Sequence, residues 1–273
     1  MKPPFIGLIT QEWSQSTYQV QATKLGIGIK TSNQEMSGSD LIEFANECDL
    51  LYVDPAIISI SAIKTAEKSG IRIYPSSKTI EELAKITSHA GEGDQLSVLV
   101  TRSAHAQAAS WPITLLTNDL CITPLPGIAD ETAQAIQISV LELAAEVGLV
   151  GGFELIVDAA DYKKLIGINW MSPTANYWSQ IGSITNFYEQ NLRAVLDLPL
   201  GSTQLLSKYV VTGALETDQN SDDYRPYLHL MARNPRLKFD QSIKQVGVAG
   251  DDLEELLTEV IHAQQYYSGK IVE

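Results

Sequence analysis

Two neighbouring stretches decide the fold: Phe153-Glu154-Leu155-Ile156-Val157, and then Leu165-Ile166-Gly167-Ile168-Asn169. Both are rich in apolar and β-branched residues, and a short polar turn at Asp161-Tyr162 separates them, so they predict two antiparallel strands of a hairpin. Successive side chains of a strand point to opposite faces. Because Phe153, Leu155 and Val157 form one face, the Glu154 carboxylate is expected on the other.

The residues that follow this hairpin are candidates for a binding site. Asn169 and Trp170 lie across from Glu154, and an aromatic, amide-rich loop runs from Met171 to Gln180. Oxygen ligands on adjacent strands could hold Mg²⁺ together with nucleotide phosphates. The alternative is that Glu154 is hydrogen-bonded at a domain interface and that the aromatic residues belong to the core.

Upstream, short β-branched runs alternate with helical patterns from Phe5 to about Lys85. The expected strands are Phe5–Ile9, Ile27–Ile29, Leu50–Val53 and Ile71–Tyr74, and the expected helices are Ser14–Leu25, Ser39–Cys48 and Ser59–Ser69. This alternation predicts right-handed βαβ units and a small parallel sheet. Gly91–Asp94 is interpreted as a turn between domains.

Beyond that turn the pattern becomes α+β. Expected strands are Leu96–Thr101, a stretch near Trp111–Leu116, Tyr209–Leu215, Tyr227–Met231 and Ser242–Val246, and expected helices are one capped by Asp130, Thr185–Leu196 and Asp252–His262. Asp218–Asp223 is interpreted as a solvated loop. The fold class is therefore α/β plus α+β, with a small parallel-sheet domain over residues 1–90 packed on a second domain over 94–273.

Composition excludes several classes of protein. The 273 residues are 44% hydrophobic and carry a formal net charge of −14, which argues against a nucleic-acid-binding surface. Two distant cysteines give neither a disulfide framework nor metal-ligand spacing. The N-terminal apolar stretch before Gln11 is too short for a signal peptide, and the longest apolar run is about a third of a bilayer span. A cytoplasmic protein without membrane contact is expected.

Common catalytic motifs are absent. The sequence has no Gly-x-Ser-x-Gly elbow, no Gly-Lys-Ser/Thr phosphate loop and no Gly-x-Gly-x-x-Gly after the first strand, where Thr10-Gln11-Glu12-Trp13 stands instead.

The hairpin and the residues after it resemble a known family. The strand around Glu154, then Asn169-Trp170 with Pro173, and then the run from Tyr188 to Thr203 are similar to the C-terminal half of N5-carboxyaminoimidazole ribonucleotide synthase, the ATP-grasp enzyme of purine synthesis. The stretch Leu96–Arg102 is similar to a family strand that ends in arginine. The resemblance implies a truncated ATP-grasp-like C-terminal domain, and a homodimer that pairs through the N-terminal and C-terminal regions.

The departures from the family fall on the chemistry. Family members carry a central subdomain that closes over ATP, between the positions equivalent to Lys85 and Ser97, where only residues 86–96 stand here. The second metal-binding carboxylate of the family is replaced by Trp170, so Glu154, Asn169 and Trp170 form a vestigial metal site. The family's substrate loop is shortened, and the basic motifs near its C-terminus are reduced. Candidate phosphate-binding or ligand-binding residues are Arg102, Arg233, Lys238, Asn176 and Ser179.

Two hypotheses follow from this resemblance. The first is a pseudoenzyme with a binding, scaffold or regulatory role, which needs no cofactor and could hold a small phosphorylated ligand. The second is an active ligase with a rebuilt site, which would use Mg-ATP to carboxylate 5-aminoimidazole ribonucleotide. Phosphoryl transfer depends on positioning and charge neutralisation, so the loss of the lid, a metal ligand and the substrate loop favours the first.

Overall fold

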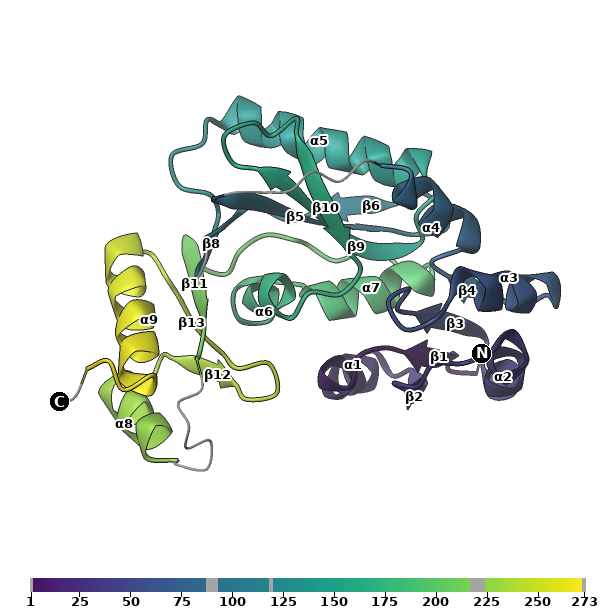
Figure 1. The fold of residues 1–273 in the computed structure, drawn as a ribbon, viewed down its shortest axis with the longest axis horizontal. Helices are drawn as coiled ribbons and strands as arrows, with labels where there is room; N and C mark the ends of the chain where they lie inside the picture. The colour runs from purple at the N-terminus through teal and green to yellow at the C-terminus, as the bar shows by residue number, and fades with distance from the viewer. Residues whose placement is uncertain (1, 87–92, 118–119, 217–223, 272–273) are drawn as a thin grey trace.

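The computed structural model describes residues 2–86, 93–117, 120–216 and 224–271, and it contains two β-sheets (Figure 1). The first sheet is parallel, as the alternating pattern predicts, with the order β2-β1-β3-β4. Its strands are β1 (Phe5–Ile9), β2 (Gly28–Ser32), β3 (Leu50–Val53) and β4 (Ile73–Tyr74), and its helices are α1 (Glu12–Leu25), α2 (Gly38–Phe44) with a 3₁₀ turn (Ala45–Glu47), α3 (Ile60–Lys68) and α4 (Ser77–Ala84). Helix α4 has no counterpart among the expected helices.

Serine side chains set where these helices begin. Ser37, Ser59 and Ser76 each accept a hydrogen bond from the backbone amide three residues later. At Ser37 the Asp40 carboxylate also accepts from the Ser37 amide, which completes a capping box. Serine caps of this kind satisfy amides that have no partner within the helix, so the polar residue before each apolar pattern fixes the helix start.

The second sheet is antiparallel, with the order β10-β9-β5-β7-β8-β11-β13-β12 and β6 paired to β5. Its strands are β5 (Gln95–Arg102), β6 (Ala108–Ser110), β7 (Thr114–Leu116), β8 (Leu120–Thr123), β9 (Gly151–Asp158), β10 (Leu165–Asn169), β11 (Tyr209–Ala214), β12 (Lys238–Asp240) and β13 (Gln245–Gly250). The helices are α5 (Asp130–Glu146), α6 (Pro173–Gly182), α7 (Phe187–Val195), α8 (Arg225–Arg233) and α9 (Leu253–Tyr267). Helix α5 covers one face of the sheet, while α6 and α7 lie on the other (Figure 1).

The start of helix α5 differs from the expectation by one residue. Ala129 occupies the cap position of α5 and Asp130 is its first residue, whereas Asp252 caps α9 and accepts from the amides of Glu254 and Glu255. The predicted apolar stripe of α5 is buried, with Val140 and Ala144 fully inaccessible.

The segment Tyr227–Met231, expected as a strand, lies within α8. The reason is the spacing of its buried side chains: Tyr227 and Leu230 are buried while Leu228 is 55% exposed. Burial three residues apart is a helical pattern, and Pro226 fits the first turn of a helix. The predicted loop Asp218–Asp223 lies outside the described residues, as does part of the predicted turn Gly91–Asp94. The domain boundary near residue 90 stays a prediction.

The two sheets share an apolar core. Tyr18 of α1 and Tyr52 of β3 pack in one cluster with Tyr188 and Leu192 of α7. The rings of Tyr18 and Tyr188 meet edge to face with centroids 5.0 Å apart, and the Asn191 amide donates to the Tyr18 hydroxyl at 2.7 Å. Helix α7 is therefore the part of the second unit on which the parallel-sheet unit rests.

Candidate functional site

Glu154 lies in the middle of β9, between β5 and the edge strand β10. Phe153, Leu155 and Val157 pack in the core under α5, and Glu154 is on the opposite face, as the alternation of a strand requires. Only 1% of its surface is exposed. The carboxyl is therefore a buried polar group rather than one that lines an open cleft.

Three side chains occupy the hydrogen-bonding sites of this carboxyl. The Ser97 hydroxyl donates to Oε1 at 2.5 Å, and the Asn169 amide donates to Oε2 at 2.9 Å. The Ser172 side chain also hydrogen-bonds to the carboxyl. Burial raises the pKa of Glu154 above its usual range, against the opposing effect of these hydrogen bonds. The raised pKa shifts this carboxyl toward the neutral acid relative to an exposed glutamate, and Asn169 offers it a nitrogen rather than a ligand oxygen.

Trp170 serves as packing between the two units. Its indole meets the Phe153 ring edge-on, with centroids 6.1 Å apart at 76°. It contacts the core under α5 and also the core of the parallel-sheet unit, which includes Ile80 of α4. An indole in this position fills space at the seam and supplies no oxygen for a cation.

The segment Met171–Gln180, expected as a loop, is mostly helical because α6 begins at Pro173. Proline is favourable in the first turn of a helix, and this was the sequence signal for it. Asn176 and Ser179 are both buried. Ser179 donates to the Asn176 carbonyl at 2.7 Å and accepts from the Phe187 amide at 3.1 Å, so its hydroxyl ties α6 to α7. Asn176 lies beside the Tyr188 hydroxyl, whose pKa is raised by burial.

The three basic candidates are not brought to Glu154. Arg102, at the end of β5, donates to the Leu149 carbonyl at 2.9 Å and so ties two backbone segments together. Arg233 ends α8 and Lys238 begins β12, and both are exposed. Figure 1 shows α6 between β12 and the β9–β10 hairpin. A phosphate held by Arg233 and Lys238 would therefore lie away from Glu154.

A second buried carboxyl, which the sequence interpretation missed, is at the end of β3. Asp54 is 2% exposed, accepts from the Ala56 amide at 2.9 Å, and accepts from the Gln11 side chain at 3.3 Å. Burial raises its pKa. In the order β2-β1-β3-β4, chain connections diverge between β1 and β3, which is where open parallel sheets bind ligands. The signal was available, because Asp54 directly follows a predicted parallel strand.

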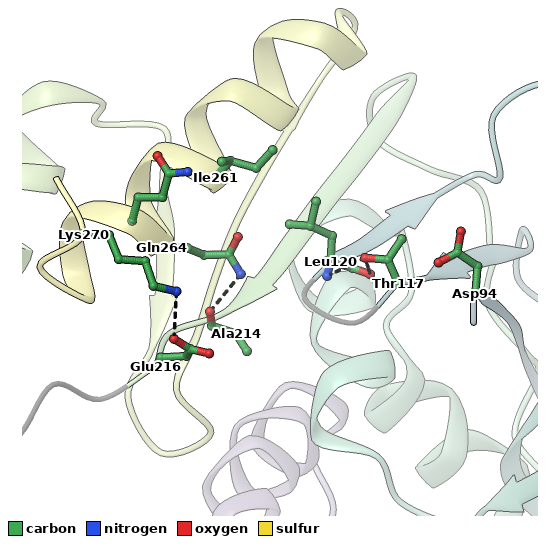
Figure 2. Close-up of a pocket in the computed structure, with 9 residues that line it drawn as sticks. Asp94, Thr117, Leu120, Ala214, Glu216, Ile261, Gln264 and Lys270 are labelled. Atoms are coloured by element: carbon green, nitrogen blue, oxygen red, sulfur yellow. Dashed lines mark hydrogen bonds and ion pairs between the residues drawn. The ribbon is translucent and has the colours of Figure 1, made fainter. Parts of the chain in front are cut away.

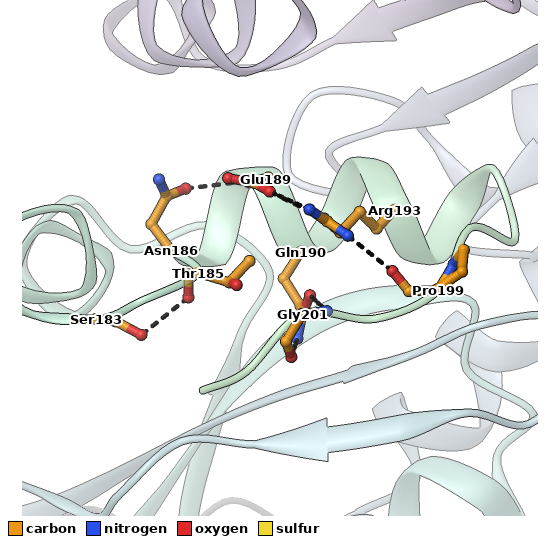
Figure 3. Close-up of polar contacts among 8 residues, drawn as sticks. All are labelled: Ser183, Thr185, Asn186, Glu189, Gln190, Arg193, Pro199 and Gly201. Atoms are coloured by element: carbon orange, nitrogen blue, oxygen red, sulfur yellow. Dashed lines mark hydrogen bonds and ion pairs between the residues drawn. The ribbon is translucent and has the colours of Figure 1, made fainter. Parts of the chain in front are cut away.

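The run from Tyr188 to Thr203, which carries part of the sequence resemblance, forms a structural clamp (Figure 3). The Gln190 side chain donates to the Gly201 carbonyl and accepts from the Gly201 amide, both at 2.8 Å. Arg193 pairs with Glu189 at 2.7 Å and donates to the Pro199 carbonyl at 3.0 Å. These contacts hold the turn after α7 against the helix, so this motif specifies structure rather than chemistry.

A separate pocket of about 470 Å³ lies between the C-terminal part of the chain and the segments of Asp94, Thr117 and Leu120 (Figure 2). Its wall includes the ion pair between Lys270 and Glu216, at 3.2 Å, and Gln264, which donates to the Ala214 carbonyl at 2.9 Å. Among the described residues that line it, none is a site residue expected from the sequence.

Within the described ranges, no group of three or more His, Cys, Asp or Glu side chains is placed to hold a metal ion. A search of the described helices for one long and apolar enough to cross a membrane found none.

Sequence comparison identifies relatives of this chain. N5-carboxyaminoimidazole ribonucleotide synthase of Mycobacterium leprae is 39% identical over 124 residues, which are 43% of this chain and 28% of that protein. The synthase of Mycobacterium tuberculosis is 36% identical over 152 residues, 52% of this chain and 35% of that protein. The match thus spans about a third of the length of these curated relatives. No protein-family model matches the chain.

Solved structures show the same fold. The N5-carboxyaminoimidazole ribonucleotide synthetase of Thermotoga maritima superposes with a TM-score of 0.80 at 15% identity, covering 96% of this chain and 98% of that one. The synthase of Aspergillus clavatus, in complex with ADP and 5-aminoimidazole ribonucleotide, gives 0.83 at 13% identity, covering 98% and 99%. The resemblance drawn from the hairpin is confirmed: the curated homologues are these synthases, and the fold is that of the ATP-grasp enzymes.

Proposed function

We propose that this relative of the N5-carboxyaminoimidazole ribonucleotide synthases has no ligase activity of its own and serves purine biosynthesis as a binding, scaffold or regulatory protein. The observation that carries the proposal is the state of Glu154. Its carboxyl is buried, accepts hydrogen bonds from Ser97 and Asn169, and has a pKa that burial raises. Mg²⁺ needs oxygen ligands with room for bound water, whereas here the carboxyl is buried and its oxygens accept from Ser97 and Asn169.

The neighbouring residues do not fit Mg-ATP. Asn169 turns its nitrogen to Glu154, and Trp170 packs between two cores where a second carboxylate would be needed. Phosphoryl transfer relies on cations that neutralise the phosphates, and a single buried carboxyl whose oxygens already accept hydrogen bonds is a poor ligand for such a cation. We therefore derive no step through a bound nucleotide.

The chain between α4 and β5 supports the same proposal. Residues 85 to 94, ten positions, separate Ala84 from Gln95. Ten residues are too few for a subdomain with its own core, so this connection supplies no second wall to close over a nucleotide and exclude water. The exposed Arg233 and Lys238 remain candidates for holding a small phosphorylated ligand, apart from Glu154.

The test measures Mg-ATP binding and substrate-dependent hydrolysis in the full chain. Calorimetry is expected to detect no binding of Mg-ATP at micromolar concentration. With ATP, bicarbonate and 5-aminoimidazole ribonucleotide, phosphate release should stay at background in the wild type and in a Glu154→Gln control. Release that needs the ribonucleotide and disappears in Glu154→Gln would overturn the proposal and favour an active ligase with a rebuilt site.

A further inference from the structure

A groove of about 440 Å³ lies between α5 and the β9–β10 hairpin. Leu155 and Val157 form part of its floor and alternate with Glu154 along β9, so the groove opens on the opposite face of the sheet from the candidate site. The rest of the apolar floor comes from Ile136, Leu143 and Leu165. A ligand of this groove would therefore be separate from anything bound near Glu154.

One wall of the groove is a row of side chains on α5 that begins with two small residues. Ala135 and Ser139 line the groove, are exposed and lie one turn apart, and Leu143 continues the row after one more turn. Small residues four positions apart leave a furrow along a helix, and a ridge of side chains on another helix packs into such a furrow. From Ala135 to Leu143 the furrow is about 12 Å long, which matches roughly two turns of a second helix.

Helix α5 also gives this wall a negative charge. It carries four carboxylates and has no lysine or arginine. Glu142 and Glu146 are exposed, and each follows a groove residue, Ser139 or Leu143, by three positions, so both lie along the furrow. In the part of the chain that the structure describes, none of the four carboxylates forms an ion pair. An occupant with lysine or arginine on this side would supply the complementary charge.

The opposite wall of the groove is the turn of the hairpin. Tyr162 lines this wall with 45% of its surface exposed, and the exposed Lys163 lies next to it. Lys164 is already paired with Asp158 at 3.0 Å, whereas Lys163 forms no ion pair with any described residue. The two walls therefore differ in the sign of their charge, which sets the chemistry of each flank of an occupant.

We propose that this groove binds an amphipathic helix of a partner protein, with basic residues on the flank that faces α5. Apolar side chains at positions i, i+4 and i+7 of that helix enter the groove, as in other helix-in-groove complexes. Its lysine or arginine residues lie against Glu142 and Glu146, and an acidic residue on its other flank faces Lys163. The inference rests on the proposed role as a binding protein, for which it names the chemistry of the partner and the face.

The first experiment measures the binding of two defined peptides to the full chain by fluorescence anisotropy, in roughly 0.1 M salt. Both are labelled peptides of roughly 18 residues, long enough to form a helix, with a leucine stripe. They differ only in having lysine or glutamate at the remaining positions. The lysine peptide is expected to bind at micromolar concentration and the glutamate peptide at least about 10-fold more weakly, because only the first complements α5. Equal binding of both peptides, or no binding of the lysine peptide, would overturn the proposal.

A substitution in the furrow tests the place of binding. Ser139→Leu puts a bulky side chain where the peptide helix packs, and should weaken binding of the lysine peptide about 20-fold. Thr258→Leu is the matched control, because Thr258 is exposed on α9 and, like Ser139, donates its hydroxyl to a carbonyl of its own helix. This control should bind as the wild type does. An affinity that Ser139→Leu leaves unchanged would place the peptide elsewhere and contradict the proposal.

A charge reversal tests the role of the acidic wall. Glu142→Lys combined with Glu146→Lys should weaken binding of the lysine peptide about 10-fold. Glu43→Lys combined with Glu47→Lys changes the net charge equally at two exposed positions of the parallel-sheet unit, and should alter the affinity by less than about 2-fold because salt screens distant charges. Equal losses in both double variants would mean non-specific attraction to an acidic chain, and self-association of the wild type that Ser139→Leu abolishes would mean that a second copy fills the groove. Either result overturns the proposal. None of these measurements involves Mg-ATP, so the two proposals fail separately.

Discussion

The clamp around α7 and the surroundings of Glu154 both resemble the synthases in sequence, but they differ in what their side chains do. In the clamp, Gln190 and Arg193 bind backbone groups of the following turn. At the hairpin, Glu154 and Asn169 bind each other, and Trp170 fills a seam. Sequence likeness therefore marks the same scaffold in both places, whereas a chemical role also depends on ionisation and access, and the Glu154 carboxyl is buried with a raised pKa.

The largest loss of stability is expected from a substitution in the clamp around α7. Gln190→Leu leaves the amide and carbonyl of the half-buried Gly201 without their partner, which should cost about 3 kcal/mol of unfolding free energy. Urea denaturation measures this loss. Gln265→Leu is the control, because Gln265 is exposed and its replacement should change stability by less than about 0.5 kcal/mol. A Gln190→Leu variant as stable as wild type would show that the clamp is dispensable.

A smaller loss of stability is expected when Trp170 is replaced. Trp170→Glu restores a carboxylate at the second metal position but places it between two apolar cores, so stability should fall by about 2 kcal/mol. Trp170→Phe keeps an aromatic ring there and should cost only ~1 kcal/mol. Calorimetry should detect no Mg-ATP binding by either variant. Micromolar binding by Trp170→Glu would show that one missing ligand, rather than the closed site, prevents the chemistry.

The smallest effect is expected at Glu154, and it depends on pH. Because the folded pKa is raised, the unfolded carboxyl ionises first as pH increases, which favours unfolding. The stability that the neutral acid provides is complete below the unfolded pKa and is lost as pH rises through the folded pKa. Glu154→Gln should match wild type within ~1 kcal/mol near pH 4 and become relatively more stable toward pH 8.

The measurement is the difference in unfolding free energy between Glu154→Gln and wild type at several pH values from 4 to 8. Asp94→Asn, at an exposed position, serves as the control for a lost charge. A difference that stays constant over this range would mean that Glu154 is ionised in the folded protein, and the comparison between the two regions would lose its basis.

Local patterns in the sequence predicted much of the fold. The alternation of strand and helix patterns predicted the parallel sheet, and the alternation of apolar and polar residues predicted the β9–β10 hairpin. The apolar stripe of α5 predicted which face of that helix is buried. Two segments were misassigned for lack of a clear local period: Tyr227–Met231 was interpreted as a strand and Met171–Gln180 as a loop. In both, the local signal of the helix was a proline in its first turn, and the helical period itself follows from the side chains that neighbouring elements bury.

The sequence by itself determined which face of β9 carries Glu154, because alternation along a strand is a local property of the backbone. Only the tertiary structure decided the state of that carboxyl. Ser97 lies 57 positions away in the chain, and Trp170 reaches α4 across the seam between the two sheets. Burial and pKa depend on which distant segments surround a group, and no spacing within one strand contains that information.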